Sequence, residues 1–426
     1  MDYVIVGNSA AAVFALEAIR CEDPGGKITL ISAETGPPYS RCLLPYYLEG
    51  QIQEEGLWIR PPSFYEALGI RTCLGQRAVK VRPASGVVVL AGGEEVPYDR
   101  LLIATGAAAR IPPIPGREAR GVFTFRNLED ARQLKSFAIK CRQTVVIGGG
   151  LVGVEAAAAL RSLGLAVTIV EFLPYLLPQA LDERGAGLVA AALRAKGIDL
   201  ALGRQVTAIL GGDKVTGVSL DDGRVIPCEL VVVGVGVKTN YELLADAGAD
   251  INAGIIVDDH MATSLPDIYA AGDVAEHFDL DRGERGIVAV WPSAAAQGRV
   301  AGYNMAGLPR EHRGSLAVNA TEICGLPLAS AGLPAATGVD DREYFTLDST
   351  TMTYRKIVTR KGRLAGMTLI GDLREAGVIT GLIARGAVIE DHEKEFIQGN
   401  FGVARLWQQF RNPSRQRWGR VVANVY

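Results

Sequence analysis

The sequence predicts an α/β protein built on two domains with parallel sheets, followed by a smaller α+β domain. Two apolar runs, YVIVG (residues 3–7) and TVVIG (144–148), predict the parallel sheets, because each leads through small residues into a helix. From residue 313 onward, strand-like runs such as YRKIVTRKGRLAGMTLIGD (354–372) indicate an antiparallel sheet with helices. A chain of 426 residues with 50 glycines has room for these domains.

The first small-residue turn, GNSAAA (7–12), has one glycine where a dinucleotide-binding turn usually has three. Such a turn lets backbone N–H groups at a helix N-terminus approach a pyrophosphate. After the second strand (27–32), Glu34 is expected to accept hydrogen bonds from an adenosine ribose. Tight packing alone would also explain the small residues. The candidate nucleotide contacts of this turn are Gly7, Ser9, Ala10 and Ala11.

The second turn, GGGLVG (148–153), has the complete G-x-G-x-x-G pattern and is followed about 20 residues later by Glu171. An acid at that position binds a ribose hydroxyl and repels a 2′-phosphate, so we expect NADH rather than NADPH. The candidate contacts here are Gly148, Gly150, Leu151, Val152 and Gly153. Two nucleotide turns imply two nucleotides, and a flavin with a nicotinamide is the natural pair for redox chemistry.

Three further segments complete a pattern: YDRLLIATGA (98–107), LVVVGVGVKTN (230–240) and LPDIYAAGDVAE (265–276). In this order they resemble the FAD-dependent pyridine nucleotide-disulfide oxidoreductase family, and the resemblance covers residues 1–395. It implies an FAD domain in two parts (1–110 and 239–312), with an NADH domain (111–238) inserted between them. It also implies a C-terminal interface domain (313–395), which makes a homo-oligomer possible.

The resemblance also assigns residues around FAD and NAD(H). Asp273 would hydrogen-bond the ribityl chain of the flavin, and Glu155 would lie near the stacked nicotinamide and flavin rings. Gly236 would border the nicotinamide nucleotide. The other assigned FAD contacts are Ala104, Thr105, Gly106, Gly272, Trp291 and Ala294.

The segment PYSRCLLPYYLEG (38–50) combines the patterns of two branches of this family. Tyr39, Arg41 and Leu44 match a Y-x-R-x-x-L segment of ferredoxin-reductase-like and nitrite-reductase-like members, in which Arg41 would belong to the flavin site. Cys42 instead resembles the single cysteine of coenzyme A-disulfide reductases and NADH oxidases or peroxidases. Arg41 beside it could depress the pKa of this thiol. The segment therefore leaves a redox cysteine and an inert one both open.

Tyr46 stands where many ferredoxin-reductase-like members carry a lysine paired with the equivalent of Glu155. Without that lysine, we expect Glu155 either to have a raised pKa or to accept a hydrogen bond from Tyr46. Cys42, Glu155 and Tyr46 are therefore the candidate catalytic residues.

Composition excludes several other classes. A formal charge of −3 argues against a nucleic-acid binder. No apolar run is long enough to span a membrane, and the N-terminus enters a strand directly, so we expect a cytoplasmic protein. Scattered cysteines and histidines predict no metal site.

The last segment, residues 396–426, contains five arginines, two tryptophans and no acidic residue. A basic aromatic arm of this kind could dock an acidic ferredoxin-like protein, and a packed or solvated extension is an equal alternative.

The sequence thus favours an NADH:acceptor flavoenzyme that exchanges electrons with an iron-sulfur protein or subunit, in either direction. The alternative is an enzyme that uses Cys42, either a coenzyme A-disulfide reductase or an NADH oxidase or peroxidase. A flavin-bearing assembly protein without turnover is a third hypothesis.

Overall fold

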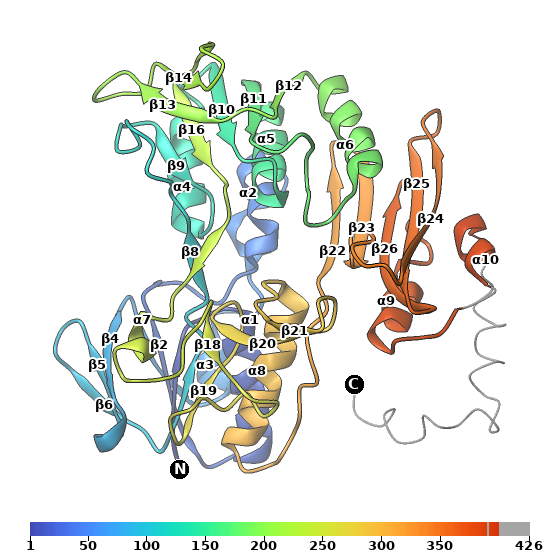
Figure 1. Cartoon of the computed structure of the whole chain (residues 1–426). Coiled ribbons are helices and arrows are strands. Elements are labelled where there is room, and N and C mark those ends of the chain that lie inside the picture. The colour runs from blue at the N-terminus through green and yellow to red at the C-terminus, as the bar shows by residue number, and fades with distance from the viewer. Residues whose placement is uncertain (390–391, 400–426) are drawn as a thin grey trace.

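Three five-stranded sheets organise the protein, two of them parallel and one antiparallel. The structure is a computed structural model that describes residues 1–389 and 392–399. In Figure 1 the N-terminal sheet lies at the bottom, the second sheet above it and the antiparallel sheet to one side. This arrangement confirms the predicted α/β class with two parallel-sheet domains and a C-terminal α+β domain.

The N-terminal parallel sheet has the strand order β19-β7-β1-β2-β3. Its strands are β1 (Asp2–Val6), β2 (Lys27–Ser32), β3 (Ile70–Leu74), β7 (Arg100–Ile103) and β19 (Ile268–Ala270). Because β19 comes from a segment far along the chain, the sheet joins two distant parts of the sequence. The smaller elements of this part of the chain are α3 (Phe64–Ala67), β4 (Ala78–Arg82), η3 (Pro83–Ser85), β5 (Val87–Leu90), β6 (Glu95–Pro97), α7 (Glu242–Ala245), β18 (Ile255–Ile256), β20 (Ala275–Asp279) and β21 (Glu284–Gly286). The segment with η1 (Arg41–Leu43), α2 (Leu44–Glu49) and η2 (Glu54–Leu57) instead reaches the second domain, where α2 packs against α4 and α5.

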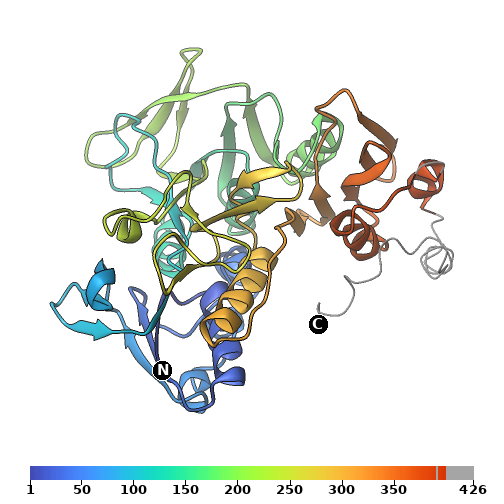
Figure 2. The ribbon, with the colours of Figure 1, turned by 60° about the horizontal axis from the view of Figure 1, so that its bottom comes forward.

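Two helices from the two ends of this domain pack closely together, α1 (Ala10–Glu22) and α8 (Trp291–Met305). Figure 2 shows α8, in orange, alongside the blue N-terminal helices. The contact requires glycine: a Cβ at Gly298 would lie 2.1 Å from the carbonyl oxygen of Ala11. A Cβ at Gly302 would lie 2.6 Å from the carbonyl oxygen of Ala15.

The second parallel sheet has the order β12-β11-β10-β16-β9. It contains β9 (Val122–Thr124), β10 (Gln143–Ile147), β11 (Ala166–Glu171), β12 (Ile198–Leu202) and β16 (Leu230–Val233), with helices α4 (Leu128–Ala138), α5 (Leu151–Ser162) and α6 (Glu183–Ala195). Strands β13 (Val206–Leu210), β14 (Gly217–Leu220) and β15 (Val225–Pro227) form a separate antiparallel sheet. The chain passes between the two parallel-sheet domains along the antiparallel pair β8 (Ala107–Ala109) and β17 (Val237–Thr239).

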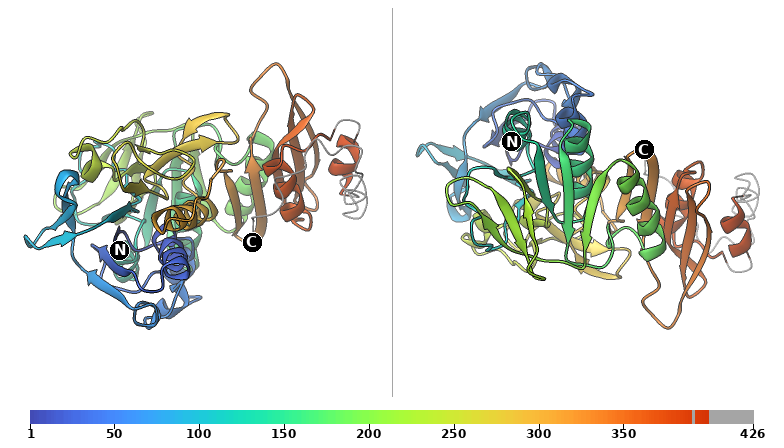
Figure 3. Two further views of the ribbon diagram at one scale, coloured as in Figure 1. Left: turned by 90° about the horizontal axis from the view of Figure 1, so that it is seen from below. Right: turned by 90° about the horizontal axis from the view of Figure 1, so that it is seen from above.

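The C-terminal antiparallel sheet has the order β22-β23-β26-β25-β24. Its strands are β22 (Val318–Ile323), β23 (Leu326–Gly332), β24 (Asp341–Asp348), β25 (Thr353–Arg360) and β26 (Arg363–Ile370), and α9 (Ala376–Ala384) and α10 (Glu393–Gln398) contact it. Figure 3 shows this unit projecting to one side, next to α6. The basic aromatic segment predicted over residues 396–426 lies outside the described residues from 400 onward. Among the described helices, none is both long and apolar enough to cross a membrane.

A buried ion pair joins the C-terminal sheet to the second domain. Lys356 on β25 has no exposed side-chain surface, and its Nζ lies 2.9 Å from Oδ2 of Asp182. Asp182 also accepts a hydrogen bond from the Tyr354 hydroxyl (2.7 Å) and caps α6 through the Gly185 N–H (3.0 Å). Each buried charge is therefore balanced by a specific partner, which makes removal of one partner costly.

We expect Lys356→Met to lower the free energy of unfolding by about 3 kcal/mol, because it removes the buried cation at 2.9 Å from the Asp182 carboxylate and leaves only the more distant, half-exposed Arg184 at 3.7 Å. Urea unfolding followed by circular dichroism measures the effect. The matched control, Lys361→Met, removes a lysine that is 75% exposed in the next turn and should change stability by less than about 0.5 kcal/mol. Equal effects of the two substitutions would contradict this account of the buried pair.

Candidate functional site

The first nucleotide turn lies where β1 ends and α1 begins. Gly7 has φ +129°, and a Cβ there would lie 2.1 Å from the carbonyl oxygen of Ala104, so the turn excludes any side chain at this position. Ser9 is the N-cap of α1, but its side chain makes no capping hydrogen bond, and Ala10 and Ala11 follow as buried residues. The first-turn N–H groups of α1 therefore suit an anionic ligand such as a pyrophosphate.

Glu34 lies beyond β2 in a pair with Arg41. The Arg41 Nη2 is 2.6 Å from Glu34 Oε1, and the Tyr39 hydroxyl donates to Glu34 Oε2. Arg41 also donates to the carbonyl oxygen of Arg126. These bonds orient the carboxylate that we expect to bind a ribose and connect it to the next segment of the site.

Arg126 is a site residue that the sequence analysis missed. Its Nη2 lies 2.6 Å from Asp273 Oδ2, and its Nε donates to the carbonyl oxygen of Ala107. Arg126 immediately precedes Asn127, which forms a capping box with Asp130 at the start of α4. That N-x-x-D signal could have marked the start of a helix, but not the distant carboxylate that the arginine binds.

The ATG segment is fixed by a residue that is distant in sequence. Thr105 Oγ1 donates to the carbonyl oxygen of Asn240, and the Asn240 amide donates back to the carbonyl oxygen of Thr105 (both 2.9 Å). The Asn240 N–H also donates to the carbonyl oxygen of Gly106. Ala104 lies against Gly7, whereas Gly236 has φ +103° and open space around its Cα. Asn240, also missed from the sequence, therefore holds the segment at the crossing between the two domains.

The AAGD turn and α8 close the same crevice from the other side. The Gly272 N–H donates to Oε1 of buried Gln297 (2.8 Å), and a Cβ at Gly272 would contact the Cβ atoms of Ala11 and Ala294. Trp291 begins α8 and packs edge-on against Phe14, with 5.5 Å between ring centroids. Its Nε1 is buried and has no hydrogen-bond partner among the described residues. A donor without a partner at this position fits a site for a polar ring system.

The second turn has the geometry that its glycines predict. Gly148 has φ +109°, and a Cβ there would lie 2.4 Å from the carbonyl oxygen of Gly234. A Cβ at Gly153 would lie 2.0 Å from the carbonyl oxygen of Gly148, whereas Gly150 faces open space. Leu151 and Val152 begin α5, and the Val152 side chain is 41% exposed. The turn is thus tight at its two ends and open in the middle, where a phosphate would approach.

Glu171 ends β11 and lies against this turn. Its carboxylate accepts hydrogen bonds from the N–H groups of Gly149 and Leu173. The acid is therefore held beside the glycine turn, in the position expected of a ribose ligand.

Glu155 on α5 is largely buried, and burial raises its pKa. The carboxylate accepts a hydrogen bond from the Thr321 hydroxyl of β22 (2.8 Å). Among the described residues no cation forms a salt bridge with it. The predicted direction of the pKa shift agrees with the structure, and burial is its cause. The predicted hydrogen bond from Tyr46 to Glu155 does not form. The pKa of the Tyr46 hydroxyl is raised, first by burial and second by the charge of Glu155. Thr321, from the C-terminal domain, is the partner that the sequence analysis missed.

Cys42 lies in the short helix η1, between Arg41 and α2. Its side chain reaches solvent, yet the surrounding protein desolvates the thiol and raises its pKa. The next causes include the charges of Glu155 and Asp273. The expectation that Arg41 would depress this pKa is wrong, because the guanidinium is bound to Glu34 and Tyr39 and burial of the thiol has the larger effect.

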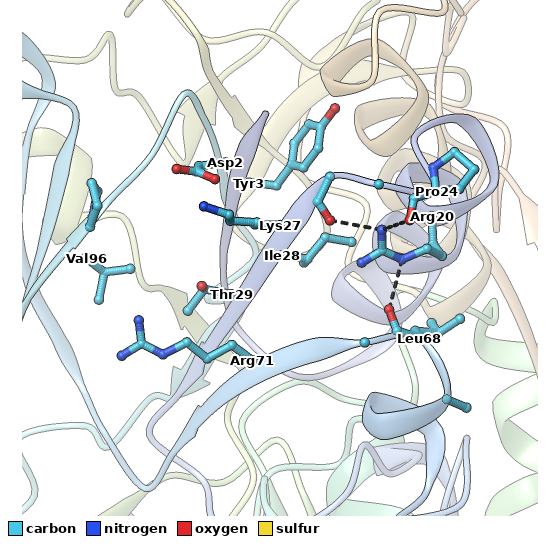
Figure 4. Close-up of a pocket in the computed structure, with 15 residues that line it drawn as sticks. Asp2, Tyr3, Arg20, Pro24, Lys27, Ile28, Thr29, Leu68, Arg71 and Val96 are labelled. Atoms are coloured by element: carbon cyan, nitrogen blue, oxygen red, sulfur yellow. Dashed lines mark hydrogen bonds between the residues drawn. The ribbon is translucent and has the colours of Figure 1, made fainter.

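A cavity of about 700 Å³ lies elsewhere, at the amino ends of strands β1, β2 and β3 of the N-terminal sheet (Figure 4). Lys27 and Arg71 line it, but Arg20 already donates to the carbonyl oxygens of Leu68, Asp23, Pro24 and Gly26. The nucleotide turns lie at the carboxyl ends of the parallel strands, where ligands bind in such sheets. We therefore place the functional site there and not at this cavity. No cluster of metal-ligating side chains occurs within the described part of the chain.

Comparison with known proteins agrees with this geometry. Residues 1–298 match the model of the family described as pyridine nucleotide-disulphide oxidoreductase. The chain is 32% identical over 393 residues to a nitrite reductase [NAD(P)H] of Bacillus subtilis (strain 168), with 92% of this chain covered but only 48% of that protein. It is 33% identical to the epsilon subunit of an NADH-dependent phenylglyoxylate dehydrogenase of Aromatoleum evansii, covering 95% of this chain and 96% of that subunit.

Among solved structures, the ferredoxin reductase of the CYP199A2 system from Rhodopseudomonas palustris superposes with a TM-score of 0.86 at 29% identity, covering 95% of this chain and 99% of that chain. The family match extends over more than half of the sequence, and it includes both nucleotide turns and the AAGD segment. It confirms the predicted pair of cofactors, FAD and NAD(H), as those of the family. The chain belongs to the pyridine nucleotide-disulphide oxidoreductase family.

Proposed function

We propose that this protein is an FAD-dependent NADH:acceptor oxidoreductase that exchanges electrons with an iron-sulfur protein or subunit. The observation that carries the proposal is the state of Cys42: it has no disulfide partner, and burial, followed by the charges of Glu155 and Asp273, raises the pKa of its thiol. A thiol with a raised pKa is a poor nucleophile at neutral pH. Electrons are therefore expected to leave from the flavin and not through a cysteine.

The residues of the site have distinct roles in this function. Bound FAD would accept a hydride from NADH and pass its electrons on singly. Glu171 and the open turn at Gly150 bind the adenosine half of NADH, while Ser9 and the start of α1 receive the flavin pyrophosphate. Asp273, oriented by Arg126, accepts hydrogen bonds from the ribityl hydroxyls.

The relatives support an iron-sulfur or multisubunit partner, since their names include a ferredoxin reductase and a dehydrogenase subunit. The proposal covers an iron-sulfur protein or subunit as the partner and electron flow in either direction. The basic aromatic segment 396–426 is proposed as one docking element on the basis of its composition.

Replacing Cys42 by serine tests the proposal directly. We expect Cys42→Ser to transfer electrons from NADH to ferricyanide or a ferredoxin within about twofold of the wild-type rate, because the thiol takes no part. An anaerobic NADH titration should consume one NADH per flavin in both proteins and give the same long-wavelength spectra. Loss of a long-wavelength band in the variant, together with loss of disulfide or peroxide reduction, would instead assign the enzyme to the thiol-dependent branch.

The pH dependence of alkylation tests the electrostatic part of the argument. Because the pKa of Cys42 is raised, the reactive thiolate should appear only above the ordinary range of about 8.5 for a cysteine. The rate of iodoacetamide labelling of Cys42, read by peptide mass spectrometry in the FAD-loaded protein, measures this. Cys42→Ser identifies the labelled peptide. An inflection well below neutral pH would show an activated thiol and contradict the assignment.

Glu171 should decide the choice of nicotinamide nucleotide. We expect Glu171→Gln to raise the KM for NADH about tenfold and to change that for NADPH little, because it removes a ribose acceptor and a charge that repels the 2′-phosphate. Steady-state reduction of ferricyanide measures both constants. Asp199→Asn, on the neighbouring strand β12, is the matched control and should leave both unchanged. Equal use of NADH and NADPH by the wild type would contradict this role.

A further inference from the structure

Two of the chain's four histidines lie against each other outside the site described above, His277 on β20 and His312 in the segment after α8. Their ring centroids are 5.3 Å apart and the rings are tilted by 42°. Beside them is a cavity of about 280 Å³, lined by Asp259, His277, Phe278, Arg285 and Arg313. No step of the proposed reaction uses this cavity or the residues that line it.

His277 has one nitrogen with a partner and one without. Its side chain is almost fully buried, with 2% of the residue exposed, and its Nε2 lies 3.0 Å from Asp259 Oδ1. Because a carboxylate only accepts hydrogen bonds, Nε2 carries the proton and Nδ1 of the neutral ring is a bare acceptor. Nδ1 is buried and has no hydrogen-bond partner within residues 1–389 and 392–399. A buried polar atom left in this way indicates a missing partner.

His312 is held by a chain of hydrogen bonds that reaches the predicted flavin crevice. His312 Nε2 lies 3.0 Å from Ser315 Oγ, which accepts a hydrogen bond from Gln297 Nε2 (3.2 Å). Gln297 in turn accepts the Gly272 N–H, next to Asp273. Both Gln297 and Ser315 are buried. These bonds fix His312, whose ring lies against His277, the one lining side chain that is almost fully buried.

The charges around the cavity favour an anion. Arg285 donates through Nη1 to the carbonyl oxygen of Val257 (2.8 Å), and its other N–H groups have no partner among residues 1–389 and 392–399. Within the same described residues, Arg313 pairs with Glu311 alone, at 3.5 Å. Asp259 is the acidic residue among the lining side chains, and its carboxylate is paired with His277. With a neutral imidazole the lining residues carry a net positive charge, and protonation of His277 adds another.

We propose that this cavity binds a tetrahedral dianion, a sulfate or a phosphate group, held by Arg285 and Arg313 with a proton taken up at Nδ1 of His277. Guanidinium groups form charge-assisted hydrogen bonds with such oxyanions. Protonation of His277, which lines the cavity, adds a positive charge beside the anion. The phosphate can be free or belong to a small metabolite.

Binding should strengthen as the pH falls. The charged and titratable groups that act on His277 are Asp258 and Asp259, which favour the protonated ring, and Arg285 and the adjacent His312, which oppose it. Burial lowers the pKa of His277 below its ordinary value, so the free site is neutral near pH 7. When an anion binds, the His277 ring must therefore take up a proton from solvent. Because that proton is less available at higher pH, binding weakens as the pH rises.

Sulfate is the probe of choice because its charge does not change between about pH 6 and pH 8. Isothermal titration of the FAD-loaded full chain should give one sulfate per chain, with a Kd that falls as the pH falls. Titrations in buffers of different ionisation enthalpy should show proton uptake. Arg285→Gln and Arg313→Gln should each weaken binding about tenfold. Arg282→Gln, an exposed arginine on the same hairpin that does not line the cavity, is the matched control and should not weaken it.

A fourth variant and two further ligands complete the test. His277→Gln should keep weak sulfate binding but abolish proton uptake and the pH dependence. Tighter binding of glycerol 3-phosphate than of inorganic phosphate would assign the site to an organic phosphate, and equal or weaker binding to the free anion. Absence of saturable sulfate binding, a pH-independent Kd in the wild type, or equal losses in Arg282→Gln and Arg285→Gln would overturn the proposal.

Discussion

The close contact between α1 and α8 is the constraint on which the N-terminal half of the site depends. These helices are separated by more than half of the chain, yet the glycines at 298 and 302 let their backbones meet at distances that no side chain would allow. The contact brings the AAGD turn and the start of α8 beside the first nucleotide turn. Any displacement of α8 would therefore move Asp273 and Trp291 away from Ser9, and the crevice would lose one wall.

Electrostatics then orders the groups within that crevice. Two carboxylates that we assign to the flavin, Glu34 and Asp273, are each paired with an arginine at 2.6 Å, and the two pairs are joined because Arg41 donates to the Arg126 carbonyl oxygen. Partly buried pairs of this kind hold their side chains in one orientation more than they stabilise the fold. They fix the acceptors in place before a ligand binds, which lowers the entropy lost on binding.

Local patterns were sufficient to predict the two parallel-sheet units, the complete glycine turn at 148–153 and the acid at Glu171, because each depends on a strand, a turn and a helix adjacent in sequence. The partners of these groups could not be predicted in the same way. Asn240 and Thr321 meet their partners only through the crossing strands and the docking of the C-terminal sheet. Arg126 likewise reaches Asp273 across 147 positions of sequence, and no local pattern encodes such a distance.

The same reasoning explains why the hybrid segment around Cys42 was ambiguous. In sequence the nearest charge to the thiol is Arg41, which predicts activation. In the structure the guanidinium is bound to Glu34 and Tyr39, and the charges that act on the thiol are those of Glu155 and Asp273. Since burial and negative charge both disfavour a thiolate, the fold converts a position that suits a nucleophile into one that keeps the proton. The chemistry of a cysteine thus depends on where its neighbours direct their charge, and adjacency in sequence does not report that direction.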